Sequence, residues 1–319
     1  MSGSRDILER ALNAQPARPD DLEPIVASIE AETGRNWRVA RRFKGGANGG
    51  AYLLTDTVGQ NVVLKVQTSN PERILAADSS VDGAERLRSA RQLVELARDH
   101  GWPTPRWEAA GRASNGVCWA LQAFVEGVQP PLLDVATADW LIEIFTLQAG
   151  MLPGHAGGWD AWVHRVLYDD WEKLRRRVLP LPGGDAIVGR VDAIAAACVG
   201  VNVTAHDLVH GDFNLTNTLV NGQGLWIIDA ESLQSGPRAL DPIKALIVSN
   251  TFGHASPDGL DRLWAYAASF DPREFALCAA AATLKIAEGV VRHGLQEAAP
   301  AFLAKKIYFL DRVQRLTGF

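Results

Sequence analysis

Apolar residues follow strand-like patterns at 37–66 and 107–125 of this chain, and helix-like patterns through most of the chain after residue 127. Alternation and glycine turns predict strands between residues 37 and 66, and two more strands around 107–111 and 117–125. An amphipathic helix is predicted to open near Asp21 and to end near Gly34. A second helix is predicted at 84–99, where apolar residues recur at helical spacing.

From residue 134 onward the helical period prevails, and the pattern predicts helices at 134–149, 159–178 and 188–199. The pair Asp241-Pro242 is typical of a helix start, with a capping side chain followed by proline in the first turn. Further helices are predicted from there to the C-terminus. The chain is therefore expected to be α+β, with a β-rich first part and a larger helical second part.

The composition is that of an ordinary globular protein, with 47% apolar and 22% charged residues among 319. A net charge of −5 gives no reason to expect a nucleic-acid partner. Neither a signal-peptide pattern nor a membrane-spanning run is visible, so we expect a cytoplasmic protein without a membrane partner. The three cysteines lie far apart in apolar surroundings and are expected to be buried free thiols.

Candidate chemistry is concentrated in the stretch His210-Gly211-Asp212-Phe213-Asn214-Leu215-Thr216-Asn217 and in Asp229, which ends a later apolar run. Phosphoryl transfer needs an acceptor for the proton of the attacking hydroxyl and hard oxygen ligands for Mg²⁺. Asp212 is the candidate for the first role. Asn217 and Asp229 are the candidates for the second.

The pattern HGDxxxxN, followed by a hydrophobic strand that ends in Asp, resembles the aminoglycoside phosphotransferase and choline kinase group. The resemblance extends over roughly residues 36–250. It implies a bilobal, protein-kinase-like fold, with a small β-rich N-lobe over 1–124 and a larger helical C-lobe over 125–319. Gly211 stands where protein kinases carry an arginine that often binds a phosphorylated activation loop, and its presence suits a small-molecule kinase without that switch.

The same resemblance implies a nucleotide site. The glycine-rich stretch 43–54 corresponds to the nucleotide loop, in which Gly46 and Asn48 would approach the phosphates. Lys65, on a predicted strand, would contact the α- and β-phosphates. The Ala123 carbonyl and the Val125 amide would face the nucleotide base at the hinge between the lobes.

Several roles stay open. The kinase lysine usually pairs with a helix glutamate, for which Glu85 is favoured over Glu95, although the partner could come from elsewhere. His210 is expected to hydrogen-bond the backbone of its loop. Glu231 could support the metal site or face a cationic substrate. The rings of Trp159 and Trp162 could stack on a sugar or base or pack in the core.

The resemblance thus implies an Mg²⁺-dependent kinase that uses ATP or GTP and phosphorylates a hydroxyl of a small molecule. An antibiotic is the first choice of acceptor, either an aminoglycoside or another compound bearing a sugar, such as a nucleoside antibiotic. A metabolic kinase of an amino sugar, choline or homoserine is the alternative within the class. A catalytically silent, kinase-like nucleotide-binding module is the alternative outside it.

Overall fold

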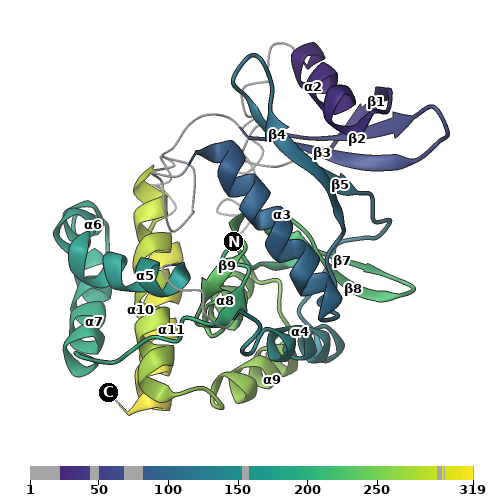
Figure 1. Cartoon of the computed structure of the whole chain (residues 1–319). Coiled ribbons are helices and arrows are strands. Elements are labelled where there is room, and N and C mark those ends of the chain that lie inside the picture. Colours follow the sequence, from purple (N-terminus) through teal and green to yellow (C-terminus); the bar gives the residue numbers. More distant parts are fainter. Residues whose placement is uncertain are drawn as a thin grey trace. The chain divides into compact units, whose positions relative to one another are not determined.

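The computed structural model describes residues 22–43, 50–67, 82–152, 158–292, 297 and 299–318 (Figure 1). The chain divides into two compact units. The first, the sheet unit, contains the described residues up to Val128 together with Leu219–Leu233. The second, the helical unit, contains Gln129–Thr218 and Gln234–Phe319. Residues 219–233 are predicted to belong to the C-lobe, whereas in the structure they cluster with the sheet unit.

The sheet unit is built on a five-stranded antiparallel sheet in the order β1-β2-β3-β5-β4 (Figure 1). Every strand lies where alternation and turn residues predicted one. The strands are β1 (Trp37–Arg42), β2 (Ala51–Asp56), β3 (Asn61–Gln67), β4 (Trp107–Arg112) and β5 (Cys118–Ala123).

Two helices complete the sheet unit. In α2 (Glu23–Thr33), Ile25 and Ile29 are buried. They belong to a core cluster that also contains side chains from one face of the sheet. The helix α3 (Gly83–Asp99) begins at Asp82, whose carboxylate accepts the backbone N–H groups of the first turn, and it packs against β4 and β5. The shared core includes Leu54, Val62, Leu64, Val66, Trp119 and Leu121.

The alternation of β3 decides where Lys65 points. Leu64 and Val66 are buried in the core cluster, and side chains of a strand alternate between its two faces. Lys65 therefore leaves the opposite face of the sheet from the one that α2 covers. The charged side chain of Lys65 is thereby kept out of the core that Leu64 and Val66 enter.

A hairpin of β7 (Thr218–Asn221) and β8 (Gly224–Ile227), followed by the short 3₁₀ helix η4 (Ala230–Ser232), belongs mostly to the sheet unit. Val220 forms an isolated bridge with Val128. The Ile227 N–H donates to the carbonyl of Pro103 at 2.7 Å. These bonds tie the segment that carries Asp229 to the sheet unit.

The helical unit is built around α10 (Pro272–Arg292), whose side chains are buried over most of its length and which packs against α6, α7, α8 and α11. In Figure 1, α10 and α11 run through this unit in yellow-green and yellow. Its other elements are α4 (Val135–Leu147), α5 (Trp159–His164), η2 (Arg165–Asp169), α6 (Trp171–Val178), α7 (Gly184–Ala197), η3 (Leu215–Asn217), α8 (Leu240–Phe252), α9 (Pro257–Ala267), α11 (Ala299–Thr317) and the strand pair β6 (Asp207–Val209) and β9 (Gln234–Gly236).

The single helix predicted at 159–178 is divided in the structure. A π-helical turn follows α5, and the Asp170 N–H donates to the carbonyl of Arg165 at 2.8 Å, five residues back. A new helix, α6, starts at Trp171. The apolar spacing does not reveal this change of hydrogen-bond register.

Two further features concern the cysteines and the length of the apolar helices. Cys118, Cys198 and Cys278 are buried free thiols, as predicted. Within the part of the chain that the structure describes, no helix combines the length and apolar character that a membrane crossing requires.

Candidate active site

The residues that carry the candidate chemistry fall on both units. In the helical unit, the segment 210–217, called here the catalytic loop, follows β6 directly. Asp241 braces this loop from the first turn of α8. Its buried carboxylate accepts the N–H groups of His210 at 2.8 Å and Gly211 at 2.9 Å, and the side-chain amide of Gln148 at 2.7 Å.

Hydrogen bonds within the loop hold the side chains of His210 and Asn217 against the backbone of Asp212. His210 is fully buried, and its Nδ1 accepts the Asp212 N–H at 3.3 Å, so His210 bonds the loop backbone. The Asn217 Nδ2 donates to the Asp212 carbonyl at 2.8 Å. Because the nitrogen of the Asn217 amide is turned to the loop, its oxygen is the atom that suits a hard metal ion. The Asp212 carboxylate is only half-buried.

Trp159 contacts the catalytic loop at Gly211, and Trp162 packs against Trp159. Trp159 is fully buried, Trp162 is 4% exposed, and their rings meet edge to face at 5.2 Å. Gly211 adopts a φ of +77° beside Trp159. The burial of both rings favours core packing over stacking on an acceptor.

Lys244 also lies close to the loop, and the sequence pattern did not predict it as a site residue. It lies three residues after Asp241 on α8 and is 7% exposed. Its Nζ sits 4.8 Å from the ring centre of Trp159 and 5.7 Å from that of Trp162. Lys244 lies one helical turn from Asp241, and this spacing is the only signal in the sequence that could have placed it near the loop. The spacing is informative only when Asp241 is known to brace the loop.

In the sheet unit, Lys65 is paired with two carboxylates. Its Nζ lies 2.5 Å from Asp229 Oδ1 and 3.7 Å from Glu231 Oε1. Burial lowers the pKa of Lys65, but the charges of Asp229 and Glu231 outweigh it and raise the pKa well above the ordinary value for lysine. The ammonium is therefore charged across the physiological range.

Asp229 has an unusual backbone. It has a φ of +63° and is the one non-glycine residue with positive φ in the described ranges. Such a conformation costs free energy for a side chain with a Cβ, and it is found most often where function requires it. It separates β8 from η4 and aims the carboxylate at Lys65.

The glutamate expected on the helix does not pair with this lysine. Glu85 is exposed in the first turn of α3, whereas the ion pairs that Lys65 makes with described residues go to Asp229 and Glu231. The partners thus come from the segment after β8. Sequence spacing could not show this, because Asp229 lies 164 residues from Lys65.

Four further residues are expected to contact a nucleotide, and two of them, Gly46 and Asn48, lie outside the described residues. Ala123 is the last residue of β5, and its N–H donates to the carbonyl of Arg106 at 2.7 Å. Val125 follows two residues later, and both positions are partly exposed, as contact with a base would require.

Asn217 and Asp229 each offer an oxygen of the kind that Mg²⁺ prefers. The amide oxygen of Asn217 belongs to the helical unit and the carboxylate of Asp229 to the sheet unit. Mg²⁺ in kinases is held by one or two protein oxygens together with phosphates and water. Across the described residues no three or more His, Cys, Asp or Glu side chains gather into a metal site.

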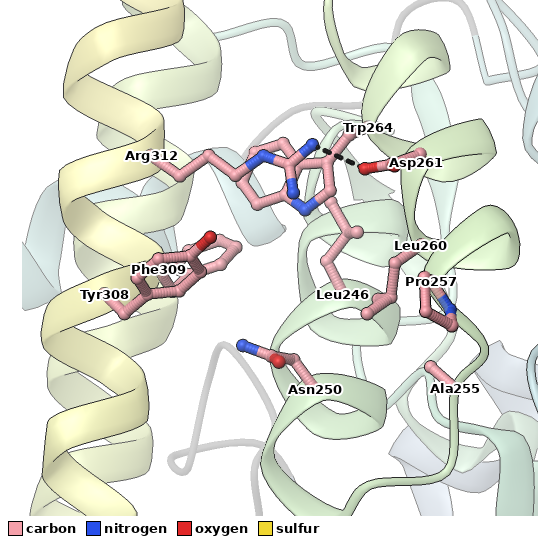
Figure 2. Close-up of a pocket in the computed structure, with 10 residues that line it drawn as sticks. All are labelled: Leu246, Asn250, Ala255, Pro257, Leu260, Asp261, Trp264, Tyr308, Phe309 and Arg312. Carbon is pink, nitrogen blue, oxygen red and sulfur yellow. Dashed lines mark hydrogen bonds and ion pairs between the residues drawn. The ribbon is translucent and has the colours of Figure 1, made fainter.

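A separate pocket of about 250 Å³ lies in the helical unit between α8, α9 and α11 (Figure 2). The Arg312 guanidinium stands 4.6 Å over the Trp264 ring and pairs with Asp261 at 3.0 Å. Asn250 lines it near the C-terminal end of α8, about 14 Å along the helix from Asp241. The pocket is thus distinct from the catalytic loop.

The profile described as "Phosphotransferase enzyme family" matches residues 39–278, which is more than half of the chain. No curated protein matches the sequence.

Solved structures share the fold at low identity. A thermostable mutant of aminoglycoside phosphotransferase APH(4)-Ia, bound to ADP and hygromycin B, gives a TM-score of 0.63 at 13% identity, with 92% of this chain and 98% of that one covered. Macrolide 2'-phosphotransferase MphH from Brachybacterium faecium gives 0.52 at 17%, covering 90% and 98%. Amicoumacin kinase hAmiN, bound to AMP-PNP, Ca²⁺ and Ami, gives 0.58 at 11%, covering 91% and 93%.

Proposed function

Because this chain belongs to the phosphotransferase enzyme family, we propose that it transfers the γ-phosphate of ATP or GTP to a hydroxyl group of a small molecule. The observation that carries the proposal is the braced catalytic loop. Asp241 holds the backbone on the N-terminal side of Asp212, and Asn217 holds its carbonyl. A loop fixed at both sides keeps one carboxylate in a set position, which is what in-line transfer needs.

Each residue has a definite part in this proposal. Asp212 orients the acceptor hydroxyl and takes its proton. Lys65 binds the phosphates as a point charge, in exchange for its present carboxylate partners. Asn217 and Asp229 would hold Mg²⁺, which neutralises phosphate charge during transfer. Most of the rate enhancement would come from placement and charge neutralisation.

We propose an antibiotic as the acceptor, which would make the enzyme a resistance factor working in the cytoplasm, where nucleotides are abundant. The support is that three structural neighbours act on or bind antibiotics: hygromycin B, macrolides and amicoumacin. These compounds differ widely in structure. The acceptor therefore has to be found with a broad panel.

The test is turnover of ATP and GTP with Mg²⁺ against aminoglycosides, macrolides, nucleoside antibiotics, amino sugars, choline and homoserine. We expect one acceptor class to gain the mass of one phosphate. Asp212→Asn should slow transfer by about 10²- to 10⁴-fold while nucleotide affinity is kept. Failure to bind any nucleotide, or transfer unaffected in Asp212→Asn, would contradict the proposal. Nucleotide binding without transfer to any acceptor would favour the silent module.

A further inference from the structure

Lys244 is a buried lysine beside the catalytic loop. It has no part in the proposed roles of Asp212, Lys65, Asn217 and Asp229. A lysine in the interior needs a compensating environment, because removing an ammonium from water costs several kcal/mol. Burial lowers the pKa of Lys244, and the charges of Asp212 and Asp241 counteract part of that effect. A residue that costs stability in this way, close to the proposed chemistry, is a candidate for function.

The tryptophan pair holds the Lys244 ammonium at the loop. Its Nζ is within cation–π distance of both Trp159 and Trp162. The same Trp159 ring is packed against Gly211, the neighbour of Asp212. One rigid aromatic surface therefore fixes the position of the ammonium relative to the loop backbone.

The charges of two carboxylates act on Lys244, those of Asp212 and Asp241. Asp241 accepts three N–H groups, from His210, Gly211 and Gln148, and so serves the loop backbone. Asp212 is half-buried and is the proposed proton acceptor. The carboxylate through which the ammonium can affect transfer is therefore Asp212.

We propose that Lys244 is a positioning residue that acts through Asp212, an inference that rests on the proposed kinase function. Its ammonium, fixed on the two tryptophan rings, orients the Asp212 carboxylate so that one oxygen faces the acceptor hydroxyl. No bond to Lys244 is made or broken in the reaction. Its contribution is to the rate of transfer and not to nucleotide affinity.

The test compares Lys244→Met with Lys244→Arg. Lys306→Met is the matched control, because Lys306 is equally buried in the same unit but pairs with Thr251 and Ile247 and not with the loop. We expect Lys244→Met to keep or raise the Tm, since a buried charge is removed, while kcat falls about 10- to 100-fold and KM for nucleotide stays within about threefold. Lys244→Arg should recover part of kcat. Lys306→Met should keep wild-type kcat.

A wild-type kcat in Lys244→Met would overturn the inference, as would a loss of kcat that only parallels a lower Tm. A second measurement needs no turnover and so separates this inference from the proposed function. The pKa of the Lys244 ammonium, followed by NMR of ¹³C-labelled lysine, should fall in Asp212→Asn, because a neighbouring negative charge is lost. An unchanged pKa would show that the two groups are not coupled.

Discussion

Gly211 and Trp159 are in such close contact that a Cβ on Gly211 would lie 1.9 Å from Cζ2 of the tryptophan ring. The contact lies next to Asp212, so it restricts the loop backbone beside the proposed catalytic carboxylate. It also gives a reason for glycine at this position that the resemblance alone does not supply. Any side chain here would collide with the buried ring.

Gly211→Ala should therefore destabilise the protein and impair transfer together. Positive φ costs about 1 kcal/mol for alanine, and the overlap with Trp159 adds about 2 kcal/mol. Gly200→Ala is the control, because its φ is +80° and nothing lies within 4 Å of its added Cβ. Denaturant unfolding measures both variants. Equal losses in the two would show that the contact with Trp159 is unimportant.

Removing the brace at Asp241 should loosen the loop. In Asp241→Asn, a side-chain amide that faces the N–H groups of His210 and Gly211 can no longer accept both, so buried donors are left unsatisfied. We expect a loss of about 3 kcal/mol in stability and at least tenfold in kcat. Hydrogen exchange of residues 209–212 reports the loosening directly. Asp258→Asn, an exposed first-turn aspartate of α9, should change neither quantity.

Replacing Lys65 should weaken the binding of the nucleotide. Lys65→Met removes the cation that pairs with Asp229 and Glu231, and it should lower kcat/KM for ATP on the order of 10²-fold. Calorimetric titration with a non-hydrolysable ATP analogue would show the weaker binding. Lys173→Met, at an exposed position of α6, is the charge-matched control. Wild-type nucleotide affinity in Lys65→Met would argue against contact between Lys65 and the phosphates.

The helical unit should lose stability in acid through Glu288. Burial raises the pKa of its carboxyl, but Lys285, Arg177 and Arg292 outweigh burial and lower the pKa below 4.5. Because the folded pKa lies below the unfolded one, the stabilisation is present above about pH 4.5 and is lost as the pH falls.

Glu288→Gln should therefore cost about 2 kcal/mol at pH 7 and progressively less below pH 4.5. Unfolding of both proteins between pH 3 and 8 checks this difference. Glu172→Gln, whose carboxylate is 67% exposed, is the control and should lie close to wild type throughout. A loss in Glu288→Gln that is constant with pH would indicate a packing defect instead of a lost charge.

The sequence by itself determined most of the fold and the identity of the chemical groups. Alternation in residues 37–66 and 107–125 predicted every strand of the large sheet, because one-face burial imposes a period of two. The loop motif and the aspartate after the next apolar run made Asp212, Asn217 and Asp229 the candidates for the chemistry, because phosphoryl transfer restricts both residue type and spacing. These signals are local, and local signals are visible in a sequence.

The tertiary structure decided which distant residues meet. It gave Lys65 the partners Asp229 and Glu231 in place of the expected Glu85, and it placed Lys244 on a tryptophan pair beside the catalytic loop. It also buried Trp159 and Trp162, whose role the sequence left open. Contacts across 30 to 164 residues depend on how the elements pack. Packing is set by the shape of many side chains together, so no single segment encodes it.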